Sequence, residues 1–140
     1  FATRMATGYA ADRRSGGHFR SVSVMLVLGA GGYALLSTGG SFLFVLGSLI
    51  AFGAGWGWPS VFHYAVVWNN PTAPGAATGI TQTGVYVGGF SGPMIFGALA
   101  DRWSYGVAWN SAAVTVLAAA ALVTVGRALM RRERAALAEV

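Results

Sequence analysis

The side chains best suited to bind a solute or to carry a proton are a histidine and its polar and aromatic neighbours in an uncharged stretch. Trp56, Ser60 and His63 are spaced so that they share one face of a helix, and Gln82 and Tyr86 share a face further along. An imidazole that takes up a proton near neutral pH, beside amide and hydroxyl groups, can hold a polar solute in an apolar wall. The alternative interpretation is structural: His63 bonds a backbone carbonyl and the tryptophans pack.

Arg4 is the charged member of this candidate pathway. It precedes Asp12 by eight residues, or about 12 Å along a helix, so we expect it below the membrane interface. A buried charge at that depth would hold an anionic solute or pair with an acid elsewhere. The alternative is that the Arg4 side chain snorkels to the interface.

No other set of residues predicts chemistry. The four acidic residues stand outside the apolar stretches, so no Ser, His and acid triad is expected. Two histidines without cysteines or acids nearby do not make a metal site, and the glycines lack the context of a phosphate loop. The sequence predicts no enzyme, no cofactor and no metal.

The elements that must position these residues are indicated by composition. The 140 residues are 55% hydrophobic and 9% charged, whereas a soluble domain carries about 25% charged residues. The eighty residues from Ser21 to Ala100 contain no Asp, Glu, Lys or Arg. This excludes an ordinary soluble surface, and the arginines cluster at the ends rather than over a nucleic-acid-binding face.

Four apolar stretches are each long enough for a membrane-spanning helix, which needs roughly 20 residues. We predict an all-α polytopic transmembrane bundle with four complete spans and the end of a preceding helix over residues 1–11. The spans are predicted at 21–37, 42–68, 77–100 and 105–126, and a basic cytoplasmic tail at 127–140. The apolar start at Phe1, without an initiator Met, favours a fragment of a longer chain.

The arginines predict the orientation. Seven lie in segments on one side of the predicted spans, and Arg102, beside Asp101, lies on the other. The positive-inside bias places both chain ends in the cytoplasm, in a plasma membrane such as the bacterial inner membrane. The seven are Arg13, Arg14, Arg20, Arg127, Arg131, Arg132 and Arg134.

The segment before the first complete span carries a motif. Gly8, Asp12 and Arg13 match the start of the pattern G-x-x-x-D-R-x-G-x-R. This resembles the signature of the major facilitator superfamily, found in the cytoplasmic loop between helices two and three and, more weakly, between eight and nine. The resemblance implies that Asp12 locks the cytoplasmic side. The alternative is a solvated loop pair, worth under about 1 kcal/mol.

The third predicted span carries a second motif. Gly79, Gly88, Gly92-Pro93 and Phe96-Gly97 resemble the family pattern G-x8-G-x3-G-P-x2-G-G, with Phe96 replacing one glycine. In the family this pattern is typical of helix five of antiporters, with helix eleven as its symmetry mate. The second span lacks the arginine usual in helix four. We therefore place the chain at the end of helix eight through helix twelve, rather than helices two to six.

Small residues and prolines mark the predicted contact and hinge positions. Stripes at every fourth residue let helices approach closely, either as static packing or as a sliding contact. Pro59 and Pro93 interrupt helical hydrogen bonding, either as hinges or as fixed bends. The stripes are Gly47, Ala51 and Gly55 on the second span and Gly84, Gly88 and Gly92 on the third, with Gly79 and Gly97 completing the motif.

The resemblance implies a secondary active transporter that moves a small solute by alternating access. Residues 42–68 and 77–100 would line its cavity. Its expected partners are the solute, H+ or another coupling ion, the lipid bilayer and the N-terminal half of the same transporter, and not nucleic acid. The alternative is a non-transporting membrane scaffold or assembly subunit that associates through its glycine stripes.

Overall fold

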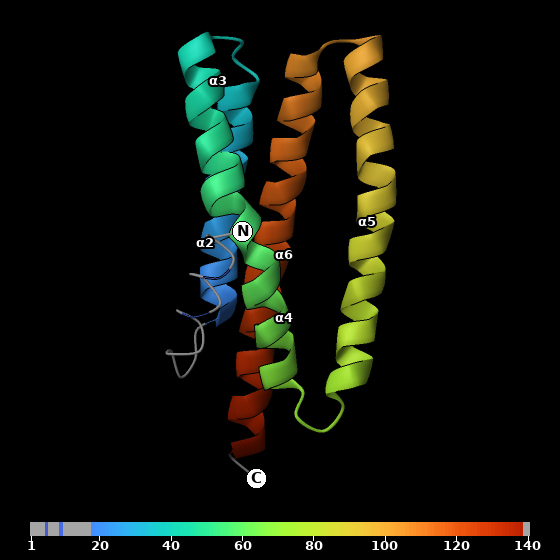
Figure 1. Ribbon diagram of the computed structural model, residues 1–140. Coiled ribbons are helices and arrows are strands. Elements are labelled where there is room, and N and C mark those ends of the chain that lie inside the picture. Colours follow the sequence, from blue (N-terminus) through green and yellow to red (C-terminus); the bar gives the residue numbers. More distant parts are fainter. Residues whose placement is uncertain (1–4, 6–8, 10–17, 139–140) are drawn as a thin grey trace.

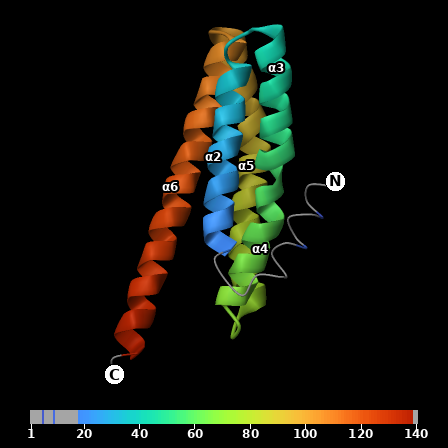
Figure 2. The same ribbon diagram turned by 90° about the vertical axis from the view of Figure 1, so that its left-hand side faces the viewer.

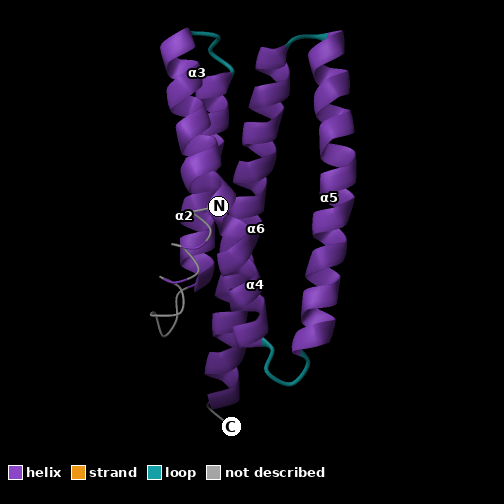
Figure 3. Ribbon diagram, viewed as in Figure 1, coloured by secondary structure: helices purple, strands orange, loops and turns teal. Residues whose placement is uncertain are grey.

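The computed structural model describes Met5, Tyr9 and residues 18–138, and the regular structure of that part is entirely helical (Figure 3). This confirms the all-α class. The helices are α2 His18–Leu36, α3 Ser41–Ser48, α4 Trp58–Asn69, α5 Pro74–Arg102 and α6 Tyr105–Ala138. Between α3 and α4 the chain winds as a π-helix, η1 Leu49–Ala54, and a 3-10 turn, η2 Gly55–Gly57.

Three helical stretches are long and apolar enough to cross a membrane. They are α2, the continuous stretch Ser41–Asn69 and the part of α6 from Tyr105 to Glu133, with mean hydropathies of 1.5, 1.5 and 1.9. At 29 residues α5 is long enough as well, but its many glycines and its threonines and glutamine lower its mean hydropathy. The predicted span at 77–100, and with it the count of four spans, therefore stays a prediction.

The helices alternate in direction (Figure 1). The turns at 37–40 and 103–104 lie at the upper end of that view, and the loop at 70–73 lies at the lower end, with the start of α2 and the end of α6. Gly39, with φ of 74°, supplies the left-handed residue of the first turn. The lower end carries Arg20 and the arginines of α6, and the upper end carries Asp101 and Arg102.

The core forms where α2, α4 and α6 meet. Val22 and Leu26 pack against Val61 and Ala120. The α6 residues that face inward are small, with Ala108, Ala113 and Ala120 all buried. The lower end of α6 then diverges from the other helices (Figure 2).

Glycines bring α2 and the second span into close contact. A Cβ built on Gly32 would lie 2.5 Å from the backbone nitrogen of Ala51, and one on Gly47 would lie 2.8 Å from the carbonyl oxygen of Gly32. A Cβ on Gly55 would lie 2.7 Å from the Cα of Gly29. The predicted small-residue stripe on the second span is thus confirmed as a helix contact.

Candidate functional site

The second apolar helix changes its winding halfway along. Pro59 has no N–H to donate to the carbonyl of Gly55, and its ring crowds that carbonyl, so the regular hydrogen-bond pattern is interrupted at this point. Just before this point, the backbone N–H of Gly55 bonds to the carbonyl oxygen of Ile50, five residues back, which is the hydrogen bond of a π-helix. Pro59 then falls in the first turn of α4, a position where a backbone N–H would have no partner within the helix. Such π-segments are frequent at functional sites.

Just past this interruption, α4 has a packed face and an opposite face. Gly57, Val61 and Ala65 are buried at the spacing of one helical face. Ser60 and His63 are rotated away from that face and are partly buried, and Trp56 is 50% exposed. One face of α4 therefore packs into the core, and the candidate pathway residues lie on the other face.

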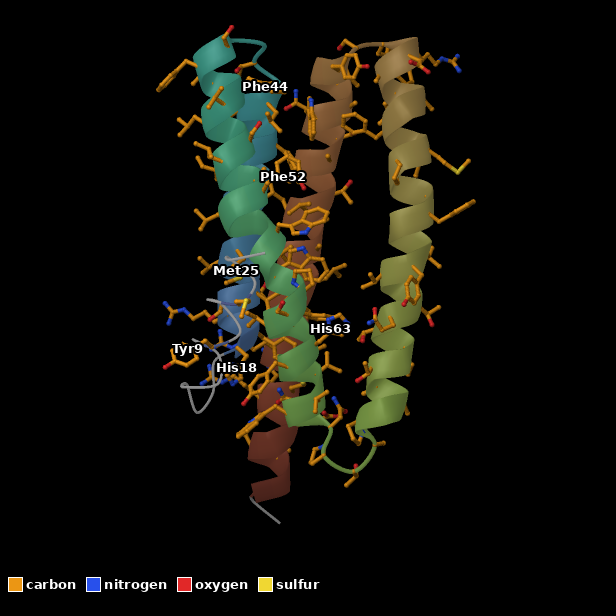
Figure 4. All side chains as sticks on the ribbon, viewed as in Figure 1. Tyr9, His18, Met25, Phe44, Phe52 and His63 are labelled. Carbon is orange, nitrogen blue, oxygen red and sulfur yellow. The ribbon has the colours of Figure 1, made fainter. Side chains whose placement is uncertain are left out.

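His63 is held by its own helix. Its Nδ1 donates to the carbonyl oxygen of Pro59 across 2.7 Å, so Nδ1 carries the hydrogen. In the neutral ring Nε2 is then an acceptor, and it is buried without a hydrogen-bond partner in the part of the chain that the structure describes. The side chain projects from α4 on the side of α5 (Figure 4). The structural interpretation is therefore correct for Nδ1, while Nε2 retains an unused lone pair.

Gln82 lies on α5 at a similar depth. It is about 12 Å above the start of α5, and His63 is about 9 Å above the end of α4. The hydroxyls of Thr78 and Thr81 bond to carbonyls of α5 itself, whereas the amide of Gln82 makes no hydrogen bond with the described residues. Tyr86, one turn higher, is 72% exposed. The structure places Gln82 and His63 on neighbouring helices without joining them.

The glycine face of α5 meets no other helix in the part of the chain that is described. A Cβ built on any motif glycine of α5 would have nothing within 4 Å, and α5 has no buried residue. Pro93 lies inside α5, which stays helical through it. Close contact at this face therefore stays a prediction. The glycines are Gly79, Gly84, Gly88, Gly92 and Gly97.

An aromatic contact that the sequence did not predict ties the upper ends of three helices together. Tyr33 of α2 stacks on Trp109 of α6 with ring centroids 5.7 Å apart, and Phe96 of α5 meets Trp109 edge-on at 4.7 Å. Ser37 Oγ lies 3.3 Å from Asn110 Oδ1 beside them. Phe96, which stands in place of a glycine in the motif, thus attaches α5 to the bundle.

A second unpredicted cluster lies at the lower end. His18 is 4% exposed, its ring meets Tyr64 edge-on at 4.8 Å, and its Nε2 has no hydrogen-bond partner among the described residues. Tyr64 in turn stacks on Trp68 at 5.9 Å. The feature of the sequence that could have indicated this cluster is a histidine directly before an apolar helix.

The remaining predicted site residues lie outside the described part of the chain. These are Arg4 of the pathway and Gly8, Asp12 and Arg13 of the gate motif. Within the described part, no three His, Cys, Asp or Glu side chains are placed to share a metal ion.

Comparison with known proteins gives no assignment. No family model, curated protein or solved structure matches the chain. The resemblance to the major facilitator superfamily therefore rests on the two motifs and their order.

Proposed function

We propose that the chain is part of a secondary active transporter that moves a small polar solute by alternating access, as the motif resemblance implies. The main support for this proposal is the interruption of the α-helix from Leu49 to Gly57 by a π-helix and a 3-10 turn, at the middle of the apolar stretch Ser41–Asn69. Transporters form their solute sites near the midplane of the bilayer from interrupted helices.

The polar groups beside the interruption support a pathway between α4 and α5. Nε2 of His63 offers an acceptor, and the amide of Gln82 offers both donors and an acceptor. Ser60, Trp56 and Tyr86 complete a wall that is otherwise apolar. This chemistry suits a solute that carries hydroxyl or amino groups, and a proton on Nε2 is the candidate coupling ion.

The scaffold alternative explains these groups less well. Leaving the Nε2 atom of His63 buried without a partner costs roughly 1–3 kcal/mol, and a scaffold gains nothing in return. The unfilled glycine face of α5 supports a further role, because small residues let other helices of a larger bundle approach. In this proposal those helices come from the rest of the transporter, and both chain ends lie in the cytoplasm.

Aqueous accessibility tests the proposal, and the chain suits the method because it contains no cysteine. Single cysteines at Ser60 and Gln82 are compared with cysteines at Val24 and Leu122, which are 52% and 73% exposed on the outside of α2 and α6. Each protein is reconstituted in vesicles and treated with a membrane-impermeant maleimide. A thiol in hydrocarbon stays protonated and unreactive.

The transporter predicts that Ser60→Cys and Gln82→Cys react at least about tenfold faster than the two controls, because only they line water. A scaffold predicts that all four positions are equally protected. Equal protection, with each variant retaining the helical content of the parent, would overturn the proposal.

A further inference from the structure

Four arginines whose side chains the structure describes lie at the lower end of the molecule and are named here the lower-end arginines: Arg20 on α2 and Arg127, Arg131 and Arg132 on α6. Three of them are exposed and Arg127 is partly buried. Among the described residues at this end, only Glu133 is acidic. The upper end carries Arg102, next to Asp101. The charge asymmetry therefore lies between the two ends of the same bundle.

The register of α2 against α6 gives the depth of these arginines. At the upper end Tyr33 stacks on Trp109, and a Cβ on Gly106 would touch the carbonyl of Ser37. Since the two helices run antiparallel, counting down from these contacts places His18 opposite about residue 125 of α6. Arg127 therefore lies half a turn beyond the level of His18.

The aromatic residues give the same boundary independently. Trp and Tyr favour the membrane–water interface, and His18 packs against Tyr64 and Trp68. At the other end Trp103 and Tyr105 are exposed. A span of roughly 20 residues counted from Tyr105 also ends near residue 125.

These depths place the α6 arginines among lipid headgroups. The headgroup layer extends roughly 5–8 Å beyond the hydrocarbon on each side. Arg131 and Arg132 lie about 9–10 Å past residue 125 along the helix, and somewhat less along the bilayer normal because spans tilt. Arg127 lies at the boundary itself.

The described residues provide little counter-charge for this group. Arg127 and Arg131 are four residues apart, where like charges repel along a helix, and Glu133 is at neither the i+3 nor the i+4 position of Arg127 or Arg131. The lower end of α6 also leaves the other helices, which uncovers it (Figure 2). Basic side chains at this depth attract the negatively charged phosphates of anionic lipids.

We propose that three of the lower-end arginines, Arg127, Arg131 and Arg132, bind the headgroup phosphates of anionic phospholipids and so anchor this end of the bundle in the leaflet richer in those lipids. The inference rests on the membrane placement of the proposed function and is independent of transport.

Lipid retention tests it. The chain is reconstituted in phosphatidylcholine nanodiscs with a minor fraction of phosphatidylglycerol, and the lipids that stay bound on release are counted by native mass spectrometry. The variant Arg127→Gln/Arg131→Gln/Arg132→Gln is compared with Arg102→Gln at the other end and with the corresponding triple Lys variant. Inorganic phosphate is added in a separate arm.

The wild-type protein is expected to retain phosphatidylglycerol in excess of its share of the nanodisc lipid. The triple Gln variant is expected to lose roughly tenfold or more of that enrichment, because each basic residue near the membrane surface contributes about fivefold to the binding of anionic lipid. Arg102→Gln and the triple Lys variant are expected to keep it. Retained enrichment in the Gln variant, or equal loss in Arg102→Gln or the Lys variant, would overturn the proposal. So would displacement of the lipid by inorganic phosphate, which would make a free anion the ligand. None of these readouts depends on transport.

Discussion

The Nδ1 atom of His63 lies 2.7 Å from the carbonyl oxygen of Pro59, the proline that follows the interruption of the second apolar helix. The contact fixes which imidazole nitrogen carries the hydrogen in the neutral ring, and so it determines what the ring can offer to a solute. The same proline therefore disturbs the helix winding and orients the nearest titratable side chain.

The first prediction concerns this tautomer. In the neutral protein His63 is expected to be protonated at Nδ1 and not at Nε2, because the Pro59 carbonyl can only accept. Nitrogen NMR of histidine-labelled protein in micelles distinguishes the two forms, and His63→Gln assigns the signal by its disappearance. A proton found on Nε2 at neutral pH would contradict the geometry.

The second prediction concerns the contact between α2 and the second span. Gly32→Ala is expected to lower the free energy of unfolding by about 2 kcal/mol, because the added methyl overlaps the backbone of Ala51. Gly31→Ala is the matched control: a Cβ there meets nothing within 4 Å, and the better helix propensity of alanine is worth up to about 1 kcal/mol. Circular dichroism during unfolding in micelles measures both. Equal effects at the two positions would refute the close contact.

The third prediction concerns the cause of the winding change. Pro59→Ala restores an N–H that can bond the carbonyl of Gly55. Amide exchange across Leu49–Gly57 is expected to slow by up to about tenfold, the effect of one added hydrogen bond. Pro93→Ala is the control, with its effect confined to α5. Unchanged exchange in Pro59→Ala would assign the winding instead to the Gly29–Gly55 contact.

The fourth prediction concerns the aromatic contact at the upper end. A double-mutant cycle of Tyr33→Leu and Trp109→Leu is expected to give a coupling energy of about 1 kcal/mol for the stacked rings. The same cycle between Tyr33 and Trp103 is expected to give a coupling near zero, because Trp103 is 63% exposed and pairs with Arg102. A coupling of the same size in both cycles would argue against a specific stack.

Composition was sufficient to predict the helical class and three membrane-competent helices. The uncharged stretch from Ser21 to Ala100 leaves few soluble alternatives, and the turn at 37–40 and the loop at 70–73 fall where glycines and prolines cluster. Helical spacing alone also places Ser60 and His63 on one face of their helix.

The partners of each surface could not be predicted. A glycine stripe shows that another helix can approach, but not which one: Gly47 and Gly55 meet α2, whereas the stripe on α5 meets nothing in the described chain. In a helix that is apolar all round, no polar face indicates which side is buried. The ring contacts of Trp109 and His18 likewise join distant segments, and local sequence carries no signal for them.

The central claim is alternating access around the interrupted helix, and two-sided labelling of one thiol tests it most directly. Ser60→Cys is reconstituted in vesicles of known orientation, and an impermeant maleimide is added from the outside of right-side-out or inside-out preparations. A trapped charged dye reports whether the vesicles stay sealed. The account predicts that the same thiol reacts from either side while the dye is retained. Reaction from one side only, from neither side, or from both with loss of the dye would contradict it.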